Sequence, residues 1–96
     1  MIGSFKDDAL EAFYFGGPGH RTRRIPNDVR GVLRRKLDQL YNAVDINDLR
    51  VPPGNRLEAL KGALAGRHSL RVNDQWRIIF RWHADAAYDV EMTDYH

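Results

Sequence analysis

The groups that could act together on a phosphate are a set of cationic side chains and the last residues of the sequence. The cations are Lys61, Arg67, Arg71 and Arg77, and the sequence closes with Asp94-Tyr95-His96. Cleaving RNA without a metal needs a base for the 2′-hydroxyl, an acid for the leaving oxygen, and cations for the charge that builds on the phosphate. Histidine can be the acid or the base, and tyrosine can stack on an unpaired base. The alternative interpretation is a set of sheet-surface arginines followed by a frayed end.

The basic residues are clustered, so the net charge of +2 understates the local charge. Of the 15 lysines and arginines, 12 are arginine. Seven lie between His20 and Lys36 with one acid, and seven more lie between Leu49 and Trp82 with two. Because the planar guanidinium pairs with two oxygens at once, such clusters favour phosphate or carboxylate partners. A solvated basic face without a partner is the alternative.

Several classes of protein are disfavoured by the composition. The sequence has no cysteine, which removes thiolate zinc sites and cysteine nucleophiles and favours a reducing cytoplasm. It contains no zinc-ligand spacing, phosphate-binding glycine loop or serine-elbow motif. No apolar run approaches membrane-spanning length, and residues 1–5 are too short and polar for a signal peptide. We therefore expect a cytoplasmic protein of one domain, residues 1–96, with no metal, cofactor or membrane contact.

The hydrophobic pattern predicts helices early in the sequence and strands late. Residues 1–5 predict a short strand, residues 6–15 a short amphipathic helix, and residues 26–43 a longer helix capped with help from Asn27 or Asp28. One helical turn is expected within residues 45–50, and strands are expected at 56–60, 68–72, 75–82 and 86–93. This order predicts an α+β fold, with an antiparallel sheet of four to five strands and the two N-terminal helices on one face.

Residues 75–82 alternate in a way that assigns the two faces of the sheet. Trp76, Ile78, Phe80 and Trp82 share one face, which should pack on the helices. The other face carries Gln75, Arg77, Ile79 and Arg81, and we expect it to stay open to solvent. Because a tight turn joins the strands of Arg71 and Arg77, both side chains could point into one cleft.

Two segments resemble signature sequences of the HigB-type "plasmid maintenance killer" toxins of the RelE/ParE superfamily. They are Pro52-Pro53-Gly54-Asn55-Arg56-Leu57-Glu58-Ala59-Leu60-Lys61-Gly62 and His68-Ser69-Leu70-Arg71-Val72-Asn73-Asp74-Gln75-Trp76-Arg77-Ile78. Residues 1–5 and 94–96 are also similar to the beginning and end of these toxins. The resemblance covers nearly the whole chain and is most specific from Pro52 to Phe80. It implies a RelE-like fold and an mRNA endonuclease that works on the 70S ribosome. It also implies a HigA-type helix-turn-helix antitoxin, through which operator DNA is bound.

The resemblance also implies roles for individual residues. It makes Arg77 the central phosphate-binding arginine, and Asp94, Tyr95 and His96 the catalytic end. Lys61 matches a basic residue that lines the cleft. We predict further contacts to RNA phosphates from Arg71, Arg67, Arg56, Arg23 and Arg24.

Two features leave the assignment open. Glu58 stands where some members of the family carry a histidine, so it could be the base, could pair with Lys61 or an arginine, or could be an exposed strand residue. The segment of residues 21–24 could grip ribosomal RNA, meet an acidic antitoxin surface, or be a mobile loop.

Two other classes of function remain as alternatives. A ParE-like toxin shares the fold but inhibits gyrase by binding, and the C-terminal His96 and the segment of residues 52–55 argue against it. A non-catalytic protein would use the basic face only to bind its antitoxin or operator DNA. Growth arrest without shortened mRNA would favour either alternative.

Overall fold

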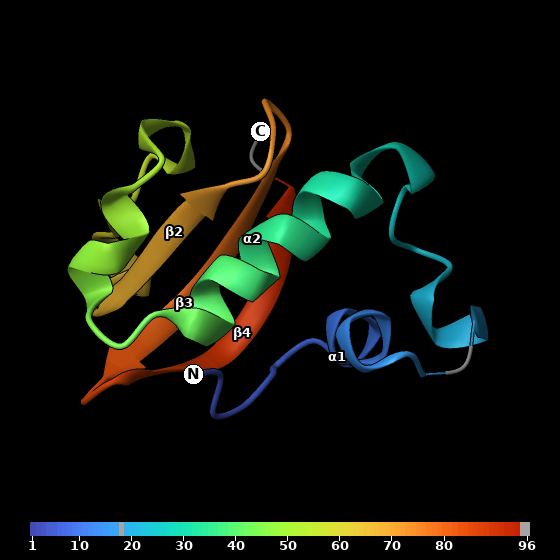
Figure 1. The fold of residues 1–96 in the computed structure, drawn as a ribbon, viewed down its shortest axis with the longest axis horizontal. Helices are drawn as coiled ribbons and strands as arrows, with labels where there is room; N and C mark the ends of the chain where they lie inside the picture. The colour runs from blue at the N-terminus through green and yellow to red at the C-terminus, as the bar shows by residue number, and fades with distance from the viewer. Residues whose placement is uncertain (18, 95–96) are drawn as a thin grey trace.

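The computed structural model describes residues 1–17 and 19–94. In this part of the chain, helices α1 (Asp8–Phe15) and α2 (Arg30–Asn42) precede a four-stranded antiparallel sheet (Figure 1). Its strands lie side by side in chain order: β1 (Glu58–Ala59), β2 (Arg67–Arg71), β3 (Trp76–His83) and β4 (Ala86–Asp94). Short 3-10 helices occupy the connections: η1 (Gly19–Thr22), η2 (Asn27–Val29), η3 (Ile46–Arg50), η4 (Pro53–Asn55) and η5 (Gly62–Leu64). The predicted α+β class is confirmed.

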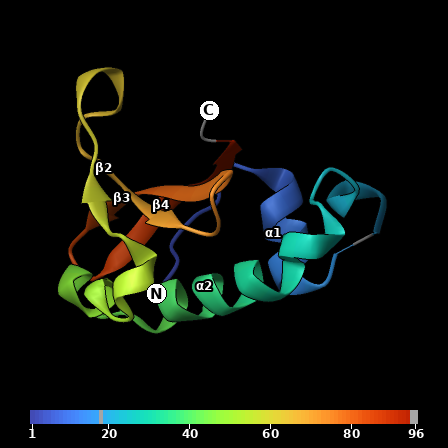
Figure 2. The ribbon, with the colours of Figure 1, turned by 90° about the horizontal axis from the view of Figure 1, so that it is seen from above.

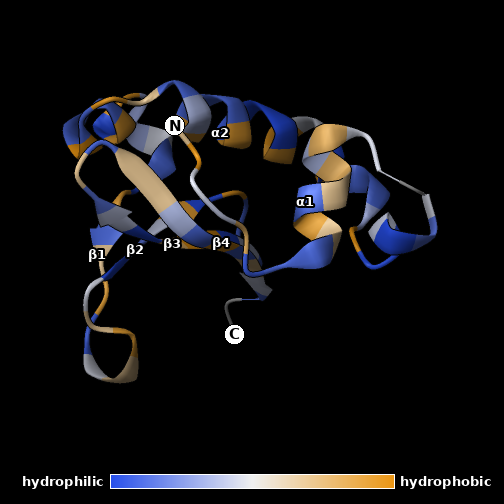
Figure 3. Ribbon diagram, turned by 90° about the horizontal axis from the view of Figure 1, so that it is seen from below, coloured by the Kyte–Doolittle hydropathy of each residue, from blue (hydrophilic) through white to orange (hydrophobic). Residues whose placement is uncertain are grey.

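The core lies between α2 and one face of the sheet. Helix α2 crosses this face, and α1 stands beside it at the β4 edge (Figure 2). The apolar stripe of α2 faces the sheet, as Figure 3 shows, and its leucines 33, 37 and 40 are fully buried. Ile78 and Phe80 of β3 are also fully buried, while Trp76 and Trp82 are half-buried against the same core. Burying each such side chain contributes about 1.5–3 kcal/mol, and the predicted inner face of β3 is confirmed.

The prediction of a first strand at residues 1–5 is wrong. This segment runs parallel to β4 but makes only isolated bridges to it, from Ile2 to Ala87 and from Phe5 to Val90. Between these two points β4 has an irregular register with β3, and Asp89 adopts a positive φ of 53°. A bulge of this kind interrupts a ladder and twists the strand, so the segment beside it cannot pair continuously.

The predicted cap of the longer helix is also wrong. Residues 27–29 form the separate turn η2, α2 begins at Arg30, and no side chain caps either start. Arg30 instead donates from its guanidinium to the carbonyls of Thr22, at 2.7 Å, and Ile25, at 3.0 Å. These bonds hold the incoming chain against the first turn of α2.

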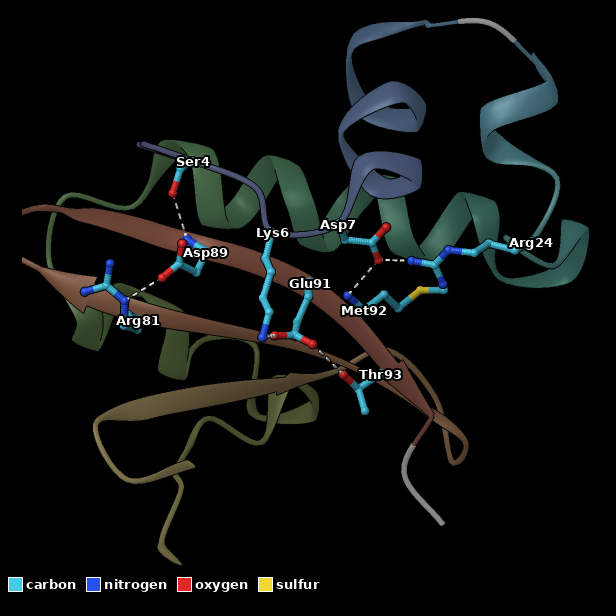
Figure 4. A network of polar contacts seen from close by, with 9 residues as sticks. All are labelled: Ser4, Lys6, Asp7, Arg24, Arg81, Asp89, Glu91, Met92 and Thr93. Carbon is cyan, nitrogen blue, oxygen red and sulfur yellow. Dashed lines mark hydrogen bonds and ion pairs between the residues drawn. The ribbon is translucent and has the colours of Figure 1, made fainter. Parts of the chain in front are cut away.

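The buried carboxylate of Asp7 joins three parts of the molecule (Figure 4). Asp7 is 9% exposed, and its Oδ1 accepts a hydrogen bond from the N–H of Leu10 at 3.1 Å, which caps α1. Its Oδ2 accepts from the N–H of Met92 in β4 at 3.3 Å and pairs with the guanidinium of Arg24. One side chain thus fixes α1 to the sheet and to the segment that precedes α2.

We predict that Asp7→Ala lowers the free energy of unfolding by about 2–4 kcal/mol, because it removes a helix cap and leaves Arg24 without its carboxylate. The matched control is Asp8→Ala, an exposed residue one position on, which should cost less than about 1 kcal/mol. Urea unfolding of both variants measures the difference. Equal losses in the two variants would contradict the role given to Asp7.

Candidate functional site

The sheet face turned away from α2 carries two pairs of arginines, set by the strand register. Arg71 of β2 lies opposite Arg77 of β3, and Arg67 lies opposite Arg81. Opposed residues of neighbouring strands point to the same face, with about 4.5–5.5 Å between their Cβ atoms. Since Ile78 and its alternate neighbours point to the core, these arginines point away from it. We name this surface the open face.

The register divides the open face into three rows. One row has Arg71, Arg77 and Thr93; the middle row has Glu58, Ser69, Ile79 and Glu91; and the far row has Arg67, Arg81 and Tyr88. Asp94 follows Thr93 at the end of β4 and lies opposite Trp76, so the register assigns it to the face of Trp76 and not to the open face. Its Oδ2 accepts from Gln75 Nε2 at 3.0 Å. The first row therefore adjoins the end of β4, from which the predicted catalytic residues Tyr95 and His96 follow; those two lie outside the described residues.

The expectation that the whole of this face is open is wrong for the centre of its middle row, at Ser69 and Ile79. Ile79 is 6% exposed and Ser69 is 1% exposed. Arginine buries its aliphatic stem along apolar surface while its charged end stays in water, and the arginine rows on either side are placed to cover the middle one in this way. The face is a basic surface over a small apolar patch.

Carboxylates neutralise part of this basic surface (Figure 4). Arg81 Nε donates to Asp89 Oδ2 at 2.7 Å, and Lys6 Nζ lies 3.4 Å from Glu91 Oε2. Arg71 forms an ion pair with Asp74 in the β2–β3 turn. The hydrogen bond from Arg81, together with the charges of Arg81, Arg67 and Lys6, lowers the pKa of Asp89. Asp89 is thus held ionised beside the far row.

Two predicted residues near β1 lie apart from the first row. Glu58 is exposed, lies opposite Ser69, and has no ion pair with a lysine or arginine among residues 1–17 and 19–94. Lys61 follows Leu60, whose N–H donates to the carbonyl of Arg67 at 2.8 Å. Lys61 is therefore at the Arg67 end of the sheet, where the chain leads into η5, which projects on the open-face side in Figure 2.

A fully buried asparagine positions β1. Asn55 Nδ2 donates to Gln39 Oε1 at 2.8 Å and to the Leu49 carbonyl at 3.1 Å, and its Oδ1 accepts from Lys36 Nζ. These bonds fix the predicted turn of residues 52–55 against α2. Arg56, the next residue, is exposed with a positive φ of 46° and leads the chain into β1.

Several basic residues before and within α2 contact other parts of the molecule than the strand arginines. Arg24 pairs with Asp7, and Arg34 donates to the Phe13 carbonyl at 3.1 Å with its guanidinium 4.7 Å from the Phe13 ring centroid. Arg23 is exposed. Much of this cluster therefore holds α1 and its flanking turns to α2.

His68 of β2, which lies between Arg67 and Arg71 in the sequence, belongs to the other face. His68 lies opposite Phe80 and stacks on its ring, with 6.1 Å between centroids. Burial lowers the pKa of His68, and the charge of Arg50 lowers it further. His68 is therefore mostly neutral near pH 7 and is not placed to protonate a group on the open face.

Two features are absent from the described part of the chain: a cluster of metal ligands and a membrane-spanning helix. Across residues 1–17 and 19–94, no three histidines, aspartates or glutamates gather closely enough to hold a metal ion. No helix there is both long and apolar enough to cross a bilayer.

Comparison with known proteins places the chain in a family. The family model of the RelE-like toxin of type II toxin–antitoxin system HigB matches residues 3–96. The chain belongs to this family. It is 50% identical to Toxin HigB-1 of Vibrio cholerae over 82 residues, which cover 85% of this chain and 84% of that one. An uncharacterised protein of Haemophilus influenzae is 44% identical over 78 residues, or 81% of this chain and 75% of that protein.

Solved structures of toxins share the fold of this HigB-like chain. YafQ of E. coli superposes with a TM-score of 0.62 at 17% identity, covering 96% of this chain and 86% of that one. The YoeB–YefM complex of Staphylococcus aureus matches with a TM-score of 0.59 at 18% identity, covering 100% and 98%. The predicted RelE-like fold is confirmed. The chain is a type II toxin, so its partner is an antitoxin.

Sequence reasoning placed Arg81 on the open face but left it out of the site, and it did not single out Tyr88 or Asp89. The segment that most resembles the family ends at Phe80, one residue before Arg81. The pairing of Arg81 with Arg67 depends on the register across the β2–β3 turn. The even spacing of Arg67 and Arg71 on one strand, and of Arg77 and Arg81 on the next, could have indicated that all four share a face.

We predict that Arg77→Ala changes the free energy of unfolding by less than about 1 kcal/mol, because the side chain lies on the open face. The adjacent Ile78→Ala should cost about 2–5 kcal/mol, because Ile78 is fully buried. Thermal and urea unfolding of the two variants make the comparison. A loss in Arg77→Ala as large as that in Ile78→Ala would assign Arg77 to the core.

Proposed function

We propose that this HigB-like toxin is a metal-independent endoribonuclease that cleaves mRNA on the ribosome and thereby inhibits translation and growth. The observation that carries the proposal is the first row of the open face, where Arg71 and Arg77 lie opposite each other. This row adjoins the end of β4, where Asp94 leads into Tyr95 and His96. This arrangement supports the proposal that cations for a phosphate act together with groups for proton transfer at the end of the sequence.

The proposed reaction uses each group for one task. The 2′-oxygen loses its proton and attacks the adjacent phosphorus, and the 5′-oxygen leaves with a proton. Arg77 and Arg71 stabilise the charge that develops on the phosphate, which is commonly the largest contribution in such sites. His96 transfers the proton, Asp94 orients it, and Tyr95 stacks on the neighbouring base.

Glu58 is our candidate for the base that takes the 2′-proton. It lies on the same face, in the row next to Arg77, and its carboxylate has no ion pair with a cation among the described residues. Lys61, Arg67 and Arg56 then contact flanking phosphates. Arg23 is exposed and free to meet ribosomal RNA, whereas Arg24 would have to leave Asp7 to do so.

The proposed partners follow from the pairing of toxins with antitoxins. We take the antitoxin to be a HigA-type helix-turn-helix protein that binds operator DNA and carries the toxin with it. The other partners are the 70S ribosome and its mRNA, in the cytoplasm. The proposal treats residues 1–96 as one domain and needs no cofactor.

Expression of the protein alone should arrest bacterial growth, and Arg77→Ala should restore it. Losing a transition-state contact of this kind lowers the rate roughly 100- to 1000-fold. The matched control is Arg35→Ala, an exposed arginine of α2, the helix that covers the opposite face of the sheet in Figure 2. Growth curves and mRNA length, measured at equal amounts of soluble protein, test this. Arrest with mRNA of full length would favour a ParE-like or non-catalytic function.

Removing Tyr95 and His96 should abolish cleavage while the fold survives, because the buried residues of β4 end at Met92. His96→Gln should lose most of the activity. Cleavage of mRNA on programmed ribosomes measures the effect, with circular dichroism as the control for folding. Full activity of the shortened chain would move the chemistry to Glu58, Lys61 and the strand arginines.

A further inference from the structure

The far row of the open face repeats the arrangement of the first row. Arg67 and Arg81 lie opposite each other just as Arg71 and Arg77 do, on the same two strands. We propose that Arg67 and Arg81 form a second phosphate-binding subsite, which the carboxylate of Asp89 occupies until RNA displaces it. This inference rests on the proposed function, since it assumes that the first row binds the phosphate that is cleaved.

The spacing of the two rows suits a nucleic acid strand. Each pair is four residues from the other along β2 and along β3, which corresponds to about 13 Å at about 3.3 Å per residue. A stacked single strand advances about 3.4 Å per nucleotide, and an extended strand advances further. About two to four internucleotide steps, or about three to five nucleotides, would therefore span both rows along the direction of β2 and β3.

Asp89 is held where a phosphate would bind. Its Oδ2 accepts from Arg81 Nε at 2.7 Å, and the charges of Arg81 and Arg67 both lower its pKa. Its own N–H donates to Ser4 Oγ at 2.9 Å, and its backbone lies at the bulge with a φ of 53°. The carboxylate is thus a fixed internal anion with the same single charge as the RNA phosphodiester that would replace it.

Arg67 retains a donor for such a ligand. Within residues 1–17 and 19–94, its Nη1 is shielded from solvent and has no hydrogen-bond partner. A guanidinium nitrogen left in this way costs free energy, which Arg67 would recover by turning outward to donate to a phosphate oxygen. Arg81 offers its remaining nitrogens once Asp89 is displaced.

An aromatic ring completes the far row. Tyr88 lies opposite Arg81 in the register and is half-buried, and the Arg81 guanidinium lies 5.9 Å from its ring centroid. Rings interleaved with arginines are the usual platform for bases of a single strand. The carboxylates of a protein partner could also pair with the two arginines. They would explain neither the aromatic ring nor the repeated spacing of the two rows, so we favour RNA as the ligand.

The test compares binding of fluorescently labelled 2′-O-methyl RNAs, which cannot be cleaved through the 2′-oxygen. One RNA has about two nucleotides and reaches only one row, and the other has about eight and spans both. The variants are Arg67→Gln, Arg81→Gln and Asp89→Asn, with Arg77→Ala to report the first row. Asparagine is tolerated at positive φ, so Asp89→Asn removes the charge and keeps the bulge. Arg35→Gln on the exposed side of α2 is the control for net charge.

We expect Arg67→Gln and Arg81→Gln to weaken binding of the long RNA about tenfold, and Asp89→Asn to tighten it several-fold. None of these variants should alter binding of the short RNA relative to Arg35→Gln. Unchanged binding of the long RNA in both arginine variants, with weaker binding in Arg77→Ala, would overturn the second subsite and leave the proposed function standing. Binding that even Arg77→Ala does not weaken would overturn both. Variants that bind RNA normally but lose the antitoxin would reassign the far row to the protein partner.

Discussion

A thin sheet covered by one long helix can bury only one of its faces, and the rest of this structure depends on that constraint. Side chains alternate between the two faces of a strand. Each residue of β3 that packs on α2 is therefore followed by a residue that points to the opposite face. Ile78 and Phe80 are fully buried against α2, and Arg77 and Arg81 are therefore placed on the far side. The core and the basic surface have a single origin in this pattern.

The helices reach their positions through buried polar groups. Asp7 ties α1 to β4 and to Arg24, and Asn55 ties the η4 turn to α2. Buried groups of this kind must be satisfied, which makes their partners specific in a way that apolar packing is not. The contacts of Asp7 and Asn55 hold the strands that border the open face, β4 on one side and β1 on the other.

Local patterns in the sequence were enough to predict the main helix and strands, and to predict which face of each is buried. The alternation in residues 75–82 identified the core side and the arginine side of β3, and the stripe of leucines identified α2. What failed depended on distant partners: the start of α2 is held by Arg30 rather than by Asn27 or Asp28, and residues 1–5 cannot pair across the bulge at Asp89. The grouping of site residues also needed the register, which places Lys61 near Arg67 rather than near Arg77.

The internal pairing of many arginines has a consequence for how RNA affinity depends on salt concentration. A cation that already holds an internal carboxylate or carbonyl, as Arg24, Arg30 and Arg34 do, releases few counterions when RNA arrives. Only phosphates that are newly neutralised contribute to the slope of affinity against salt, about 0.7 per contact for a single strand. On the open face, Arg71 and Arg81 also pair with carboxylates, those of Asp74 and Asp89. The slope for this protein should therefore be far smaller than the 15 lysines and arginines of the sequence suggest.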